Sequence, residues 1–132
     1  MKNTNFNLEE RTAAFGEAVI EFCRGLQLNT VITPLIGQFV RAATSIGANY
    51  CEANEAESKK DFRHKIAICR KETNETKFWL RMVAKACAPQ RGRARELWRE
   101  ASELHLIFCA IVRTIDKNLR AEQQARRTPP TP

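Results

Sequence analysis

Apolar and small residues recur along the chain at alternating steps of three and four positions, which is the spacing of one face of an α-helix. Asn7, followed by Glu10, has the form of an N-terminal capping box. The run that follows ends near Gly25 and consists of Leu8, Thr12, Phe15, Val19, Phe22 and Leu26. We therefore predict a first helix from about residue 8 to residue 25.

Three further runs with the same spacing follow, and residues that start or stop helices separate them. Pro34 suits the first turn of the second helix. The apolar face of this helix, which we call its seam, consists of Ile36, Phe39, Ala43, Ile46, Tyr50 and Ala53. Ser58, with Asp61 three residues later, resembles the N-cap of a third helix. Its seam is Phe62, Ile66, Cys69, Thr73, Thr76, Leu80, Val83 and Cys87. Pro89 and Gly92 interrupt the pattern before the fourth seam, which is Ala94, Leu97, Ala101, Leu104, Phe108, Ile111, Ile115 and Leu119.

No segment alternates with the period of two that a strand would show. Four helices of roughly 18–30 residues joined by short breaks predict an all-α fold, an antiparallel up-down-up-down four-helix bundle over residues 1–120. Residues 121–132 end in RRTPPTP, hold three prolines and have no seam. We expect them to form a disordered tail.

A second, partial apolar stripe accompanies the seams of the third and fourth helices. It consists of Ile68, Trp79, Met82 and Ala86 on the third helix and Trp98, His105, Ile107 and Val112 on the fourth. Because a small bundle needs one apolar face per helix, the stripe predicts burial against another copy of the chain. The alternative is a broad core-facing arc on the two longest helices.

The chain has 132 residues, the size of one domain with its own core. No apolar run reaches the roughly 18 residues that span a bilayer, so we expect no membrane partner. The opening stretch MKNTNFNLEERT lacks the apolar region of a secretory signal, and we expect a cytoplasmic protein. The cysteines form no C-x-x-C pair and fall among apolar positions, which predicts reduced, buried thiols at Cys23, Cys51, Cys69, Cys87 and Cys109.

The net charge of +7 is unevenly distributed. Residues 1–57 hold 4 basic and 7 acidic residues, whereas residues 58–132 hold 18 basic and 8 acidic residues. Basic residues gather at the starts of the third and fourth helices, and this polarity suits an acidic partner. The candidate nucleic-acid-binding residues are Lys59, Lys60, Arg63, Lys65, Arg91, Arg93, Arg95 and Arg99.

Clusters of this kind neutralise phosphates without reading sequence. Consecutive helices of an antiparallel bundle start at opposite ends, so the two clusters are not expected to merge within one subunit. Aromatic residues do not interleave with the clusters as a stacking platform requires. Solvation of helix faces and contacts between subunits are therefore the alternatives.

Residues suited to catalysis or metal binding form no recognisable pattern. A carboxylate-bridged metal centre in a bundle needs two Glu-x-x-His pairs and two further glutamates, whereas Asp61 and His64 are the one acid-x-x-His pair. His105 and Cys109 lie one helical turn apart, which we interpret as a partly exposed imidazole beside a core thiol. The five glycines are isolated, so no phosphate-binding loop is predicted. We predict no catalytic residue, no metal and no cofactor, and hence no enzyme.

Polar residues border the seams where the second and third helices face each other. Asn49 and Glu52 follow one edge of the second helix, and Lys71, Glu72 and Glu75 border the seam of the third. An unpartnered buried charge costs roughly 3–5 kcal/mol, so we expect these five residues to form a paired structural network that fixes helix register. A polar ligand pocket is the alternative.

Two blocks of sequence carry a resemblance to a known family. They contain Ser45, Ile46, Asn49 and Glu52 in the first block and Lys71, Glu72, Glu75, Thr76, Trp79 and Leu80 in the second. Together they resemble the signature of a bacterial four-helix-bundle family, the 23S rRNA intervening-sequence proteins, over roughly residues 8–119. Family members often carry a glycine soon after the first-block glutamate, where this chain has Ala53 and Asn54.

The resemblance implies an antiparallel four-helix bundle, relatives that assemble as homopentamers, and no catalytic residues. It also implies kinship with the accessory proteins of diversity-generating retroelements, which bind nucleic acid and a reverse transcriptase through a basic surface. The leading hypothesis is therefore a non-enzymatic, ring-forming bundle, a pentamer, with a binding or scaffold role involving RNA, DNA or a nucleoprotein such as a reverse transcriptase. The alternative is a purely structural or protein-binding module whose charge only tunes self-assembly.

Overall fold

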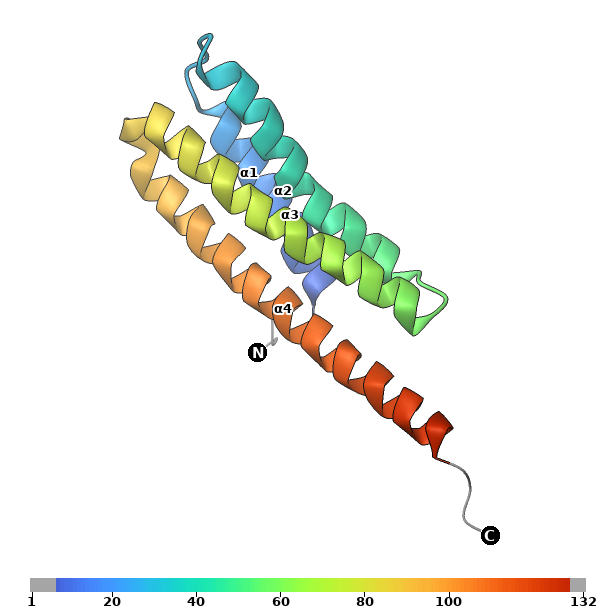
Figure 1. The fold of residues 1–132 in the computed structure, drawn as a ribbon. Coiled ribbons are helices and arrows are strands. Elements are labelled where there is room, and N and C mark those ends of the chain that lie inside the picture. Colours follow the sequence, from blue (N-terminus) through green and yellow to red (C-terminus); the bar gives the residue numbers. More distant parts are fainter. Residues whose placement is uncertain (1–6, 129–132) are drawn as a thin grey trace.

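A computed structural model describes residues 7–128, which fold into a bundle of four long helices (Figure 1). The helices are α1 (Leu8–Arg24), α2 (Ile32–Asn54), α3 (Lys59–Ala86) and α4 (Arg91–Arg127), and a single 3-10 turn, η2 (Ala88–Gln90), joins α3 to α4. The described residues contain no strand. The prediction of an all-α four-helix bundle is confirmed. No helix in this part of the chain is long and apolar enough to cross a membrane.

Side-chain caps fix three of the helix starts. The Glu10 amide donates to Asn7 Oδ1 at 3.2 Å, and the Asp61 amide donates to Ser58 Oγ at 3.0 Å, as the sequence predicted. Asn29 provides a cap that the sequence interpretation missed, because its Oδ1 accepts from the amide of Ile32 at 2.8 Å. This bond explains why α2 begins before Pro34.

Ion pairs between helices establish that α3 and α4 run antiparallel. Lys59 at the start of α3 pairs with Glu122 near the end of α4, and Arg63, one turn later, pairs with Asp116. The partner therefore moves toward the start of α4 as the position on α3 advances. Figure 1 shows the same up-and-down course for all four helices, with α3 flanked by α2 and α4.

The predicted seams meet in a continuous hydrophobic core. Phe39, Ile46, Ile66, Leu104 and Phe108 are fully buried within it. Three threonines are also buried: Thr12, Thr73 and Thr76. The hydroxyl group of each donates to a carbonyl oxygen of its own helix, so all three have a hydrogen-bond partner. Burial of the apolar faces is thus the main source of stability.

Much of the second apolar stripe is accommodated inside the single chain. Trp79, Ala86 and Ile107 pack against the core, and Val112 is 2% exposed. These positions support the broad core-facing arc. Trp98 differs because it is 44% exposed. Self-association remains a prediction.

The end of α4 corrects the predicted domain boundary. The helix continues past residue 120 to Arg127 and projects beyond the other helices (Figure 1). The segment 121–127 reads AEQQARR and consists of strong helix formers, which sustain a helix without an apolar seam. The prediction of a disordered tail is therefore wrong for residues 121–127. Residues 129–132 of that tail, and residues 1–6 of the predicted bundle, lie outside the described residues.

The cysteines match the prediction at three of five positions. Cys23, Cys69 and Cys87 are buried, and Cys109 is half-buried. Burial raises the pKa of the Cys69 thiol to about 12 and that of Cys23 to about 11. Cys51 is exposed, so its predicted burial is wrong, and its thiol donates to Glu9 at 3.7 Å.

Candidate nucleic-acid interface

The predicted basic residues at the start of α3 are largely paired within the chain. Arg63 donates two hydrogen bonds to the Asp116 carboxylate, at 2.8 Å and 3.1 Å. Lys59 pairs with Glu122. Lys65 donates to Glu52 at 2.7 Å, and among the described residues Lys60 has no ion-pair partner. Most of this cluster is therefore committed to carboxylates of its own chain.

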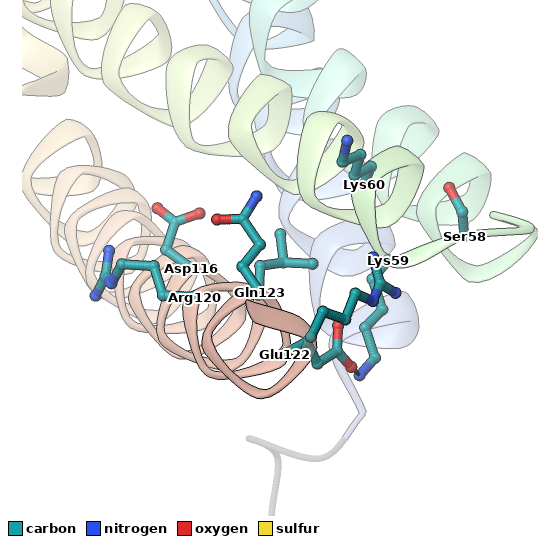
Figure 2. A pocket seen from close by; sticks show the side chains of 9 residues that line it. Ser58, Lys59, Lys60, Asp116, Arg120, Glu122 and Gln123 are labelled. Atoms are coloured by element: carbon teal, nitrogen blue, oxygen red, sulfur yellow. Dashed lines mark hydrogen bonds and ion pairs between the residues drawn. The ribbon is translucent and has the colours of Figure 1, made fainter. Parts of the chain in front are cut away.

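A cleft of mixed charge lies between the start of α3 and the end of α4 (Figure 2). We call it the α3-start cleft; it is lined by Ser58, Lys59, Lys60, Asp116, Leu119, Arg120, Glu122, Gln123 and Arg126. Figure 2 shows Lys59 reaching toward Glu122. The hydrogen bond from Arg63 lowers the pKa of Asp116, and the bond from Lys59 lowers that of Glu122. Both carboxyl groups are thus ionised and offset the cations around them.

The arginines at the start of α4 behave differently. Arg93 pairs with Glu96 of its own helix at 2.8 Å. Arg91, Arg95 and Arg99 are exposed, and none of them has an ion-pair partner among residues 7–128. Three guanidinium groups at this end of the bundle are therefore available to an external anion.

These three arginines line a groove between the end of α3 and the start of α4. We call it the arginine groove; it is open to solvent, has a volume of about 440 Å³ and is lined by Leu80, Arg81, Ala84, Arg91, Ala94, Arg95, Trp98 and Arg99. Leu80 and Ala94 are buried and form its apolar floor. The lining contains four arginines and no carboxylate, whereas the α3-start cleft contains four basic and two acidic residues.

Trp98 lies among these arginines and overturns the expectation that no aromatic residue interleaves with the basic clusters. The Lys77 ammonium sits 4.5 Å from the centre of the Trp98 ring, in a cation–π contact from α3. In sequence, the signal was the spacing of Arg91, Arg95 and Trp98 at four and then three residues, which places them on one helix face. Arg81 joins them from α3, and only the tertiary register brings it there.

The two basic clusters lie at opposite ends of the bundle, as the antiparallel order predicted. Figure 1 shows α3 beginning beside its connection to α2 and α4 beginning at the far end of α3. The chain therefore presents one partly neutralised and one open basic surface, separated by the length of the helices.

The predicted five-residue polar network between α2 and α3 does not form as a unit. Asn49 donates to the carbonyl oxygen of Ser45, within α2, at 2.8 Å. Glu52 is exposed and bonds to Lys65 rather than to Lys71. Lys71 is exposed and forms no ion pair with another described residue. The structure separates these three residues from the remaining two, Glu72 and Glu75.

Arg41 makes a second polar contact between α2 and α3, in addition to the Lys65–Glu52 pair. Its guanidinium pairs with Glu75 and lies 3.5 Å from Glu72. The Trp79 indole N–H donates to Glu75 at 3.2 Å. Glu72 Oε1 is buried and has no hydrogen-bond partner among the described residues. Nothing in the apolar pattern singled out Arg41, because its importance depends on helix register.

The described residues contain no group of three His, Cys, Asp or Glu side chains that could hold a metal ion. His105 lies beside α3, and its Nδ1 is buried with no hydrogen-bond partner in this part of the chain. Burial, followed by the charges of Lys77 and Arg70, lowers the pKa of His105. The imidazole is therefore neutral at physiological pH.

The chain is similar to proteins of one known family. It is similar to a protein of unknown function from the S23 ribosomal protein family of Bacteroides thetaiotaomicron, with a TM-score of 0.70, 28% identity, and coverage of 79% of this chain and 96% of that one. No curated protein matches the chain. The family model described as 23S rRNA-intervening sequence protein matches residues 5–110. Since this match covers most of the sequence, the chain belongs to the 23S rRNA-intervening sequence protein family.

Proposed function

We propose that this protein binds the phosphate backbone of RNA through the arginine groove and serves as a non-enzymatic component of a nucleoprotein complex. The observation that carries the proposal is the lining of the groove, which combines four arginines with an exposed indole and no carboxylate. The α3-start cleft, with its ion pairs, is the weaker candidate.

Arginine chemistry supports a phosphate ligand at this position. A guanidinium group donates in a planar fork that matches two phosphate oxygens. Arg91, Arg95 and Arg99 follow one another at four-residue spacing, which places them about 6 Å apart along one side of α4. A row of cations with no internal acid attracts a polyanion and gains from the release of its counterions.

Self-association into a homopentameric ring is part of the proposal. Phe78 on α3 and Leu106 on α4 are 52% and 67% exposed, and large exposed apolar side chains favour contact with another protein surface. A ring would repeat the arginine groove in each subunit and strengthen binding by avidity.

The same exposed side chains favour the second candidate function, a structural or protein-binding module whose charge tunes assembly. Light scattering of a charge-reversed variant, Arg91, Arg93 and Arg95 to Glu, separates the two. If the oligomer dissociates, the arginines belong to subunit contacts. If it stays intact and RNA binding is lost, the RNA proposal is supported.

Titration of labelled RNA at several salt concentrations tests the proposal directly. The variant R91A/R95A/R99A should bind more weakly, and its slope of log affinity against log salt should be smaller by about 2–3, since each lost phosphate contact accounts for roughly 0.7–0.9. The matched control is K71A/R113A/K117A, which removes the same charge from exposed residues outside both the arginine groove and the α3-start cleft. Equal losses in both variants, or no binding by the wild type at low salt, would contradict the proposal.

A further inference from the structure

We infer that the arginine groove selects single-stranded nucleic acid over a duplex, with one unpaired base stacked on Trp98. This inference rests on the proposed function and adds the class of ligand. Trp98 is the basis of the inference, because phosphate binding by the arginines does not explain why an indole lines the groove. The residue is 44% exposed and lines the arginine groove, so a ligand in that groove can cover its apolar ring.

Trp98 is held in place from one side. The Lys77 ammonium lies 4.5 Å from the ring centre, over one face of the indole. Trp98 also lines the arginine groove, and 44% of the residue is open to a ligand. A ring that is already positioned loses little conformational freedom when a base stacks on it. Bases stack on aromatic side chains regardless of sequence, because every base has a π-face.

The neighbouring arginines surround the indole with phosphate-binding groups. Arg95 precedes Trp98 by three residues and therefore shares its face of α4, while Arg99 follows it directly. Arg81 reaches the same groove from α3. The spacing of about 6 Å between successive arginines is similar to the distance between successive phosphates of one extended strand. A single strand along α4 thus places its backbone on the arginines and a base on Trp98.

A duplex does not fit this arrangement. Its base faces are stacked on one another, so exposing one to Trp98 requires unpairing and unstacking. A duplex can contact the outer arginines but leaves the indole uncovered.

Binding measurements with two RNA forms test the inference. Fluorescence anisotropy compares an unstructured single strand of about 10 nucleotides with a duplex of the same length, for wild type, W98A and W98F. We expect tighter binding of the single strand, a loss of about tenfold or more in W98A, and recovery of most of that loss in W98F, whose ring still stacks. Duplex affinity and the salt slope should be the same in wild type and W98A.

Tryptophan fluorescence supplies an independent readout. The chain has two tryptophans, so W79F leaves Trp98 as the remaining indole. Quenching of Trp98 by the single strand and not by the duplex supports stacking.

Other outcomes overturn the inference in distinguishable ways. Equal binding of both RNA forms, with W98A unchanged, refutes stacking and leaves phosphate binding intact. No binding of either form at low salt removes the proposed function as well. If W98A changes the oligomer mass and leaves RNA binding unaltered, the indole contacts another protein surface and the inference is wrong. Circular dichroism establishes that W98A and W98F keep the helical fold.

Discussion

Replacing Arg41 by methionine should destabilise the bundle, because it leaves the Glu72 carboxylate without a nearby cation. The Glu72 side chain is 12% exposed, and Arg41 is its ion-pair partner at 3.5 Å. Breaking a fully buried ion pair costs roughly 3–5 kcal/mol, whereas an exposed pair contributes about 0–1 kcal/mol. Arg41 is 48% exposed, so the expected loss lies between these limits, at about 1–3 kcal/mol.

Urea denaturation followed by far-UV circular dichroism measures this loss. The corresponding fall in melting temperature is roughly 4–10 °C for a domain of this size. The control is Arg24→Met, which breaks an ion pair with Glu21 whose side chains are 74% and 71% exposed. That substitution should cost less than about 0.5 kcal/mol.

The double variant R41M/E72M separates a buried-charge effect from lost packing. Removing Glu72 also removes its unpartnered Oε1 atom, so the double variant should be more stable than R41M alone. Glu75 retains the hydrogen bond from Trp79 in both. The reasoning is refuted if R41M is as mild as Arg24→Met, or if the double variant is less stable than R41M.

Three further predictions follow from the core, the α3-start cleft and the thiols. Phe108→Ala should lower the free energy of unfolding by about 3–5 kcal/mol, because the side chain is fully buried; a loss below about 1 kcal/mol in urea titrations would contradict the packing. Since Arg63 lowers the pKa of Asp116 in the folded state, their interaction stabilises the protein above the unfolded pKa and is lost as the pH falls below about 4. The melting temperature of Asp116→Asn should therefore fall less than that of the wild type between neutral and acidic pH, and parallel curves would argue against the pair. Cys69 should resist alkylation in the native protein and react only after unfolding, whereas exposed Cys51 should react at once; mass spectrometry of the labelled peptides distinguishes them.

Features that depend on neighbouring residues in sequence were predictable. Asn7 and Ser58 cap helices through bonds to amides three residues away, and the four seams reflect the helical period alone. The prediction of a disordered tail was wrong because residues 121–127, although they lack an apolar seam, are strong helix formers that continue α4.

Features that depend on register between helices were not predictable. Arg63 lies beside Asp116, and Arg41 lies beside Glu72, only because of the way the antiparallel helices align. The same alignment brings Arg81 of α3 next to Trp98 of α4 and creates the arginine groove. The sequence showed the basic excess, and the structure shows which part of it is unpaired.

Ultraviolet crosslinking of the protein to RNA, followed by mass spectrometry of the crosslinked peptides, tests the central claim most directly. The account predicts crosslinks in the segment 91–99, centred on Trp98, that disappear when the salt concentration rises. Crosslinks confined to residues 59–65, or their absence at low salt, would contradict it.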